Sequence, residues 1–312
     1  MSEHATEPTF FQGYPAVALR SPQLEAVFAP QTGMIGCSLL HDGEELLHHR
    51  AGLARYEATG STMGIPLLHP WANRLGGTSY TVGERTVEID MDSPQVRSDP
   101  NGLPMHGVIH ASYWDEHEPT TDPPSVGATL HFAKHAELAT EFPFPHAITV
   151  TATLRENVLT VDATVAATGD SPVPLAFGFH PYLALPGVPR ADWHVEVPLT
   201  ERLKLDDRMI PTGTTETVEP FDGALGERTF DDGYAGARDG TTFALSGGGR
   251  RIELELVSGY RYAQVYAPAN EDTVSFEPMT APTDALRSGR GLELVEPGQS
   301  RRATFAISVT RA

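Results

Sequence analysis

The sequence predicts a large all-β protein built mainly from antiparallel strands, with only a few short helices. Three observations carry this prediction. Short runs in which apolar and polar residues alternate recur along the whole chain. The 29 glycines and 26 prolines are spread between these runs, where they favour turns. Helical periodicity is nearly absent, and many strands at short spacing indicate a β-sandwich or a barrel.

The N-terminal half contains several expected strands and two expected hairpins. Residues 1–14 are assigned to a loose segment before the first strands. The turn Asp42-Gly43 and the turn Gly83-Glu84 each separate two runs of alternating residues. The expected strands of this half cover residues 24–29, 34–40, 45–48, 78–82, 86–91 and 128–132.

The clearest strand pair lies in the middle of the chain. Residues 148–154 and 158–165 alternate apolar and polar side chains on both sides of a short turn, which predicts an antiparallel pair with one face toward a core. Further strands are expected at 193–197, 242–245, 251–257, 262–266, 273–277 and 303–309, and helical turns at 135–140 and 283–287. No linker or composition shift divides the chain, so residues 1–312 are interpreted as one domain.

Composition and charge exclude several classes of function. The chain carries 41 acidic and 22 basic residues, a formal net charge of -19, which disfavours nucleic-acid and membrane partners and, more weakly, a highly anionic substrate. Cys37 is the only cysteine, so neither an internal disulfide nor a cysteine-based metal cluster is expected. The polar start of the chain does not resemble a signal peptide, and no apolar run is long enough to span a bilayer. We therefore expect a cytoplasmic protein.

Two ionisable residues stand at the ends of extended runs. The apolar run 173–183 contains His180, which is followed by Pro181, and the run 273–277 ends on Glu277, which is followed by Pro278. Because proline interrupts regular backbone pairing, both strands are expected to stop there and to present an imidazole and a carboxylate at a sheet edge. The two groups form a candidate general acid–base pair. The alternatives are a buried core histidine and an ordinary loop carboxylate.

Further polar residues lie in apolar or glycine-rich surroundings. Asn73 and Arg74 offer hydrogen-bond donors beside the indole of Trp71, although Arg74 alone would also suit a surface ion pair. His106 precedes a glycine, and His110 follows four residues later. In an extended segment this spacing does not form a helical metal pair, and no third ligand is evident, so no metal is expected.

The long, proline-rich loops 92–104 and 111–127 are expected to be functional. Gln264 lies in a predicted strand, and Asp231 and Asp232 lie among aromatic residues, where they could accept hydrogen bonds from hydroxyl groups. The alternative for each of the three is an ordinary turn or strand-surface residue. Arg, His, Asp, Gln and Glu beside Trp and Tyr suit a carbohydrate, because planar polar groups bind hydroxyls while aromatic rings cover C–H faces. The sequence has no phosphate loop, dinucleotide fingerprint or nucleophile motif.

The order of these motifs resembles the aldose 1-epimerase (galactose mutarotase) family over roughly residues 15–310. The matching motifs are Asn73-Arg74, His106-Gly107, Gly178-Phe-His-Pro-Tyr-Leu183, Phe230-Asp231, Gln264-Val-Tyr266 and Phe276-Glu277-Pro278. The resemblance implies a large antiparallel β-supersandwich and the cofactor-free interconversion of the α and β anomers of a free sugar.

The resemblance also implies roles for individual residues. Glu277 would be the base that takes the C1 hydroxyl proton, and His180 would be the acid that protonates the ring oxygen. His106 would contact the ring oxygen as well. The remaining expected sugar-binding residues are Arg74, Asp231, Gln264, Asn73, Trp71 and Tyr182.

Two alternatives stay open beside a mutarotase for an unphosphorylated aldose. One is a hexose-6-phosphate 1-epimerase. It is disfavoured because Val108-Ile109-His110 follows the His-Gly pair, where His110 could only partly replace an arginine, and because the chain is strongly acidic. The other is a sugar-binding protein of the same fold without turnover. The expected partner is a small sugar, with no nucleic acid and no membrane, and the protein is expected to be a monomer or a homodimer. The sequence does not specify the natural sugar, the pathway, or which of Asp231 and Asp232 faces the site.

Overall fold

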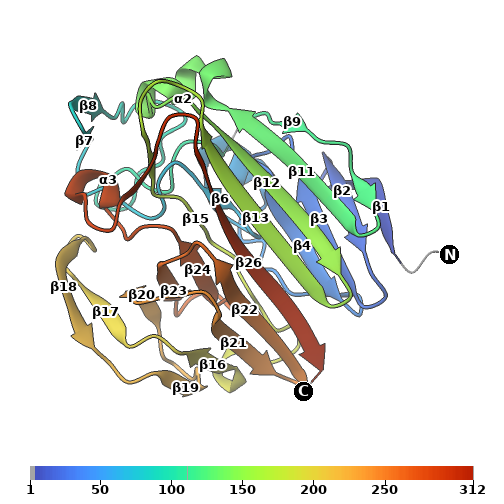
Figure 1. The fold of residues 1–312 in the computed structure, drawn as a ribbon. Helices are drawn as coiled ribbons and strands as arrows, with labels where there is room; N and C mark the ends of the chain where they lie inside the picture. The colour runs from blue at the N-terminus through green and yellow to red at the C-terminus, as the bar shows by residue number, and fades with distance from the viewer. Residues whose placement is uncertain (1–3, 111, 312) are drawn as a thin grey trace.

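The computed structural model describes residues 4–110 and 112–311 and confirms the all-β prediction (Figure 1). Its strands form two large and three small sheets, and every pairing between named strands is antiparallel. The helices are short, as expected. They are α1 (Leu53–Thr59), α2 (Ala136–Glu141), α3 (Ala285–Ser288) and the 3-10 turns Phe132–Lys134 and Arg190–Asp192.

The largest sheet has ten strands and contains the predicted central hairpin. The hairpin strands pair in register from His146↔Ala167 to Arg155↔Val158, and their alternate residues are buried. In spatial order the sheet consists of β10 (Thr120–Thr121), β11 (Pro124–His131), β12 (His146–Arg155), β13 (Val158–Ala167), β26 (Ser300–Arg311), β22 (Arg250–Ser258), β21 (Thr241–Gly247), β16 (His194–Val197) and β19 (Phe221–Ala224), with β9 (Asp115–Glu116) beside β11.

The second large sheet has seven strands and carries the polar motifs. In spatial order it consists of β18 (Pro211–Thr217), β17 (Glu201–Leu205), β20 (Phe230–Ala235), β23 (Tyr262–Ala267), β24 (Ser275–Met279), β15 (Gly178–Phe179) and β6 (Leu67–Leu68). Its β17–β18 hairpin projects at the lower left of Figure 1. This hairpin is mostly exposed, so it lacks the apolar alternation by which strands are recognised in a sequence.

The small sheets correct the expectation for the N-terminus. Residues of the segment expected to be loose form strand β1 (Ala5–Phe11), which pairs with β2 (Tyr14–Arg20) around a tight turn at Gln12 and Gly13, both with positive φ. Backbone hydrogen bonds form this pair although the side chains of β1 are largely exposed. The small sheets are β1 (Ala5–Phe11), β2 (Tyr14–Arg20), β3 (Leu24–Ala29), β4 (Ile35–His41) and β5 (Glu44–Glu45); β7 (Ser79–Val82) and β8 (Arg85–Glu88); and β14 (Val173–Leu175) and β25 (Glu293–Val295).

The two large sheets pack against each other through aromatic side chains. Phe276 of β24 stacks on Phe243 of β21 with ring centroids 5.1 Å apart, and Phe179 of β15 lies 5.0 Å from Phe305 of β26. All four rings are at most 1% exposed. Burial of each contributes roughly 1.5–3 kcal/mol of hydrophobic free energy, so these contacts fix the inner face of the seven-stranded sheet.

Pro278 does not end its strand, contrary to the expectation from the sequence. Strand β24 continues to Met279, and Pro278 itself lies opposite Ala263 of β23. On the other side β24 is joined to β15 at only one position, Gly178↔Met279, so the missing proline N–H interrupts little pairing. Glu277 therefore lies within a strand rather than at its end.

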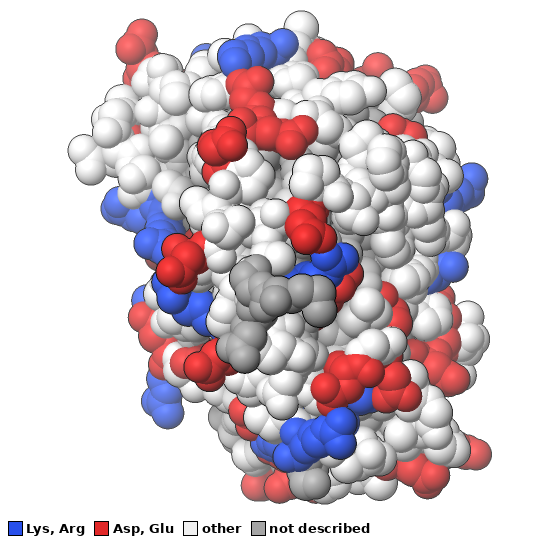
Figure 2. Space-filling model, turned by 90° about the vertical axis from the view of Figure 1, so that its right-hand side faces the viewer, with Lys and Arg blue, Asp and Glu red and all other residues white. Residues whose placement is uncertain are grey.

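Acidic and basic side chains intermingle over the face drawn in Figure 2. Many of the charged groups form surface ion pairs, such as Lys134 with Asp115 and Arg261 with Asp239. Within residues 4–110 and 112–311, no helix is long and apolar enough to cross a membrane.

The turn at His106-Gly107 joins two distant segments. His106 and Gly107 both have positive φ, at 67° and 72°. The amide of His106 donates to the carbonyl of Asn73, and the amide of Val108 donates to the carbonyl of His69. A Cβ atom at Gly107 would lie 2.0 Å from that His69 oxygen. Only glycine fits at position 107. The turn places the His106 imidazole on the side of the seven-stranded sheet that carries the polar motifs.

We therefore expect Gly107→Ala to destabilise the protein far more than Gly102→Ala. Gly102 has nearly the same φ, 74°, but its added Cβ would meet nothing within 4 Å. Gly102→Ala should cost only the left-handed strain, about 1–2 kcal/mol, whereas Gly107→Ala should cost more than about 3 kcal/mol. Urea denaturation of both variants measures the difference, and equal losses would show that the close approach to His69 does not matter.

Two histidines form a hydrogen-bonded pair inside the core. His69 Nε2 lies 2.7 Å from His146 Nε2, and His146 Nδ1 donates to the carbonyl of Phe144 at 2.6 Å. His146 Nε2 is therefore the acceptor of the pair, and His69 Nε2 is the donor. The ring centroids of Phe132 and His146 lie 4.0 Å apart. Burial lowers the pKa of His146 to about 4 and that of His69 well below its usual value. Both rings are neutral in the folded protein.

The buried histidines should make the protein less stable as the pH falls from about 6.5 toward 4. In this window the unfolded chain binds protons that the folded state excludes, so the free energy of unfolding decreases, by up to about 1.4 kcal/mol per pH unit for each such histidine. Chemical denaturation at several pH values measures the slope. A His69→Phe/His146→Phe double variant should reduce the slope by the share of these two residues, whereas His117→Gln, at an exposed site, should not. An unchanged slope in the double variant would contradict this explanation.

Candidate active site

The seven-stranded sheet presents a row of polar side chains on the face opposite the core. Asp231 of β20 lies opposite Tyr266 of β23, and Gln264 of β23 lies opposite Glu277 of β24. Because residues opposite each other point to the same face, and residues two apart do so as well, all four side chains share one face. His180 follows β15 and reaches the same face beside Glu277.

All of these side chains except Gln264 line a cavity of about 230 Å³. That volume is below the roughly 300–1,000 Å³ of pockets for drug-sized ligands, so it suits a small molecule. The opposite wall is formed by loops around positions 50, 73 and 97–106. The lining residues are Arg50, Thr62, Asn73, Arg74, Arg97, Pro100, Met105, His106, His180, Tyr182, Asp231, Tyr266 and Glu277.

The predicted acid–base pair is in direct contact. His180 Nε2 lies 3.2 Å from Glu277 Oε1, and both side chains are nearly completely buried. The Tyr182 ring stacks on the His180 ring at 4.1 Å with an interplanar angle of 9°, and its hydroxyl lies 3.1 Å from His180 Nε2. Glu277 Oε2 and His180 Nδ1 are buried and have no hydrogen-bond partner in the part of the chain that the structure describes.

Burial determines how this pair is protonated. It raises the pKa of Glu277 well above its ordinary value, and the negative charge of Asp231 raises it further, against the opposing effect of Arg74. Burial lowers the pKa of His180, and the positive charges of Arg50 and Arg97 act in the same direction. Both shifts favour a protonated, neutral carboxyl group on Glu277 beside a neutral imidazole on His180.

Arg74 is held in a network of polar partners. Its Nε donates to Asp99 at 2.9 Å, and its NH1 donates to Asn73 Oδ1 at 2.9 Å, while its NH2 lies 4.0 Å from Asp231. Burial raises the pKa of Asp99, but hydrogen bonds from the Leu103 amide and from Arg74 outweigh this and keep it below its usual value. Asp99 therefore stays ionised and ties Arg74 to the loop.

The structure shows which aspartate faces the cavity. Asp231 accepts a hydrogen bond of 2.6 Å from Gln264 Nε2 and lines the cavity. Asp232 points to the other face of β20, where it lies 3.6 Å from Arg202. Gln264 does not itself line the cavity, so its contribution is to position Asp231.

Trp71 was expected to bind sugar, and the structure corrects this expectation. The indole is 1% exposed and belongs to the main hydrophobic core, outside the cavity. A side chain with so much apolar surface is more stable there than at the wall of a polar cavity. The aromatic rings that do line the cavity belong to Tyr182 and Tyr266.

The two histidines considered for metal binding have different neighbours in the structure. His106 lines the cavity, with its ring 5.7 Å from that of His180, but His110 packs near Tyr56 and Gly60. Burial lowers the pKa of His110 to about 4, with a further contribution from Arg97. The two imidazoles therefore belong to different environments.

Sequence reasoning missed two arginines of the cavity wall. Arg50 pairs with Glu271 through two hydrogen bonds of 2.8 and 2.9 Å, and its guanidinium lies 5.1 Å from the centre of the Tyr182 ring. Arg97 lies in the proline-rich loop 92–104, whose length indicated a functional loop without identifying a residue. Thr62, which is bonded to the Tyr182 hydroxyl at 2.6 Å, carried no recognisable sequence signal.

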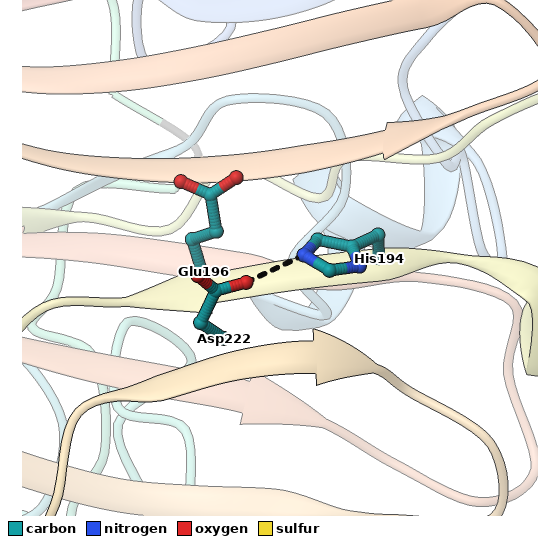
Figure 3. A group of neighbouring side chains, drawn as sticks. All are labelled: His194, Glu196 and Asp222. Carbon is teal, nitrogen blue, oxygen red and sulfur yellow. Dashed lines mark hydrogen bonds and ion pairs between the residues drawn. The ribbon is translucent and has the colours of Figure 1, made fainter.

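One surface cluster has the composition of a metal site. His194 and Glu196 of β16 and Asp222 of β19 lie together at the edge of the ten-stranded sheet (Figure 3). His194 is already bonded to Asp222 at 2.7 Å, and Glu196 accepts two hydrogen bonds from Arg251. Ion pairing at an exposed edge accounts for these contacts, so we assign no metal to the cluster.

Known proteins resemble this chain in sequence and in fold. A relative described as the uncharacterized protein YihR of Escherichia coli (strain K12) is 23% identical over 287 residues, which cover 82% of this chain and 87% of the relative. A galactose mutarotase-like protein from Clostridium acetobutylicum superposes with a TM-score of 0.86 at 17% identity, over 100% of both chains. Galactose 1-epimerase from Lactobacillus acidophilus NCFM superposes with a TM-score of 0.79 at 14% identity, over 99% of both chains.

Sequence comparison also identifies the family. Residues 16–308, nearly the whole chain, match the family model described as Aldose 1-epimerase. The match includes the strands that carry Asp231, Gln264 and Glu277 and the segment that carries His180. The chain therefore belongs to the aldose 1-epimerase family.

Proposed function

We propose that the protein interconverts the α and β anomers of an unphosphorylated aldose by general acid–base catalysis. The observation that carries this proposal is the contact of His180 with Glu277 in a small polar cavity. A carboxyl group and an imidazole that share one proton can exchange protons with two neighbouring oxygens of a substrate. The C1 hydroxyl and the ring oxygen of an aldose are such a pair of oxygens.

The proposed reaction uses the shared proton. In the reactive state the proton lies on His180, and Glu277 is ionised. Glu277 takes the proton of the C1 hydroxyl while His180 protonates the ring oxygen, so the C1–O bond of the ring breaks and C1 becomes a carbonyl. Rotation about the C1–C2 bond and the reverse proton transfers close the ring with the opposite configuration. The ring-opened state leaves the proton on Glu277, the position that the raised pKa of this carboxyl group favours.

The other lining residues are assigned to sugar binding. Arg74 and Asn73 offer hydrogen bonds from the loop wall, and Asp231 accepts hydrogen bonds from the sheet wall. The Tyr266 ring lies 5.6 Å from the His180 ring and can cover a C–H face of the sugar. His106, whose Nδ1 is buried without a hydrogen-bond partner in the described residues, is positioned to meet the ring oxygen beside His180.

A sugar-binding protein without turnover is less well supported. Burying a carboxyl group and an imidazole with one unpartnered atom each costs stability, and simple recognition of hydroxyls does not need it. Such a cost is common where the groups perform proton transfer.

Glu277→Gln should lower the rate of anomer interconversion by roughly 10²–10⁴-fold, because the amide cannot take the C1 hydroxyl proton. Polarimetry or anomeric NMR on freshly dissolved α-aldoses measures the rate above that of buffer. Glu255→Gln, the same change at an exposed position of β22, serves as the control. A folded Glu277→Gln variant with undiminished turnover would refute the assigned base.

Asp231→Asn should shift the alkaline limb of the pH–rate profile to lower pH. Activity requires the His180–Glu277 pair to keep one proton, which is lost as the pH rises through the raised pKa of Glu277, so kcat/KM should fall with pH through an apparent pKa above the ordinary carboxyl value. The charge of Asp231 contributes to that elevation, and its removal should lower the apparent pKa while raising KM. Asp232→Asn is the matched control, because Asp232 faces Arg202 on the opposite side of the strand. If both variants shift the limb equally, the charge next to Glu277 is not the cause.

A further inference from the structure

The three arginines of the cavity differ in how their charges are balanced. Arg50 donates two hydrogen bonds to Glu271, and Arg74 donates one to Asp99. Arg97 donates a single hydrogen bond of 3.2 Å to the carbonyl of Gly60. Within residues 4–110 and 112–311, no carboxylate forms an ion pair with it. Arg97 therefore brings a positive charge to the cavity that the protein does not neutralise locally.

The position of Arg97 is fixed by its loop. The amide of Met105 donates to the Arg97 carbonyl at 2.8 Å, and the amide of Asp99 donates to the Leu103 carbonyl at 2.9 Å. The Asp99 carboxylate closes the loop through the amides of Asn101 and Leu103. This scaffold holds the backbone at Arg97, whose side chain lines the cavity together with His106 and is bonded to the Gly60 carbonyl. Such preorganisation lowers the entropic cost of binding.

The unpaired positive charge of Arg97 opposes the proposed reaction unless an anion neutralises it. Partial burial of an unpaired guanidinium is unfavourable, and burial lowers the pKa of Arg97. The charges of Arg50 and Arg97 also lower the pKa of His180, which has to be protonated in the reactive state. A ligand anion at Arg97 would remove the first penalty and the contribution of Arg97 to the second.

We propose that the substrate is an aldose with a single negatively charged substituent on a carbon other than C1, and that Arg97 binds this substituent. This inference rests on the proposed epimerase function and names its substrate class. One charge is favoured over two, because one arginine lacks a partner while Asp231 and Glu277 already line the cavity. The formal net charge of -19 further disfavours a doubly charged sugar.

A panel of matched sugars tests the charge and shape of the substituent. Anomer interconversion is measured by NMR in the gluco and galacto series with a neutral C6 hydroxymethyl, a C6 carboxylate, a C6 sulfonate and a C6 phosphate. The carboxylate is a planar monoanion, the sulfonate a tetrahedral monoanion and the phosphate a tetrahedral group of higher charge. We expect one monoanion to exceed both the neutral sugar and the phosphate in kcat/KM by roughly 10-fold or more.

Variants of Arg97 test whether this residue is the cause. Arg97→Gln should lower the preference for the anionic over the neutral sugar by roughly 10- to 100-fold, and Arg97→Lys should retain part of it. Arg55→Gln, at an exposed position of α1, changes the net charge equally and should retain the full preference. A preference that survives in folded Arg97→Gln, or an equal or better rate with the neutral or phosphorylated sugars, would overturn the inference.

Binding of non-reactive analogues separates the inference from the proposed function. A 1,5-anhydro sugar lacks the C1 hydroxyl and cannot open, so calorimetric titration with the neutral and anionic forms reports recognition alone. Tighter binding of the anion that is lost in Arg97→Gln, without turnover of any sugar, would support the inference and refute the epimerase function. Turnover of neutral sugars, with equal binding of both analogues, would support the function and refute the inference.

Discussion

The site depends on one constraint, which is the alternation of side chains between the two faces of the seven-stranded sheet. Phe276 and Val265 point into the core, while Glu277 and Tyr266, their immediate neighbours in sequence, point into the cavity. Because side chains alternate along a strand, a register shift of one residue would bury the carboxylate among apolar rings and expose the phenylalanine. The stacking of Phe276 on Phe243 therefore fixes the position of Glu277 as firmly as any hydrogen bond. The candidate base is rigid because its neighbour is part of the core.

The opposite wall of the cavity is built on a different principle. Arg50, Asn73 and His106 all have positive φ, a conformation that costs roughly 1–2 kcal/mol for residues with a side chain. The backbone hydrogen bond from His106 to Asn73 and the side-chain bond from Arg74 to Asn73 hold the turns at Asn73 and His106 in place. One wall thus consists of strands whose order comes from the core. The other consists of strained turns whose order comes from polar contacts, so its geometry depends on every partner being present.

The parts of the fold that the sequence predicted are those with a periodic signal. The central hairpin and the strands bearing Gln264 and Glu277 alternate clearly, and His180 and Glu277 stood out as ionisable groups in apolar runs. Strand β1 and the β17–β18 hairpin are held mainly by backbone hydrogen bonds, which leave no such pattern. Trp71 was misplaced because its polar neighbours in sequence are not its neighbours in space. Arg50 and Arg97 reach the cavity from loops, where a role depends on tertiary contacts that no local pattern encodes.

The charges of the cavity can be considered together. Glu271 and Asp99 neutralise Arg50 and Arg74 from outside the lining, and Glu277 is neutral while it holds the proton of the pair. Moving that proton to His180 creates a carboxylate and an imidazolium in adjacent positions. The carboxylate is stabilised by Arg74, but the imidazolium meets the repulsion of Arg50 and Arg97. Burial and the charges of Arg50 and Arg97 all oppose an acidic His180, and of these two arginines only Arg50 is paired with a carboxylate in the described residues. In the proposed reaction, a ligand anion at Arg97 would reduce this opposition, so substrate recognition and acid catalysis would be coupled through one arginine.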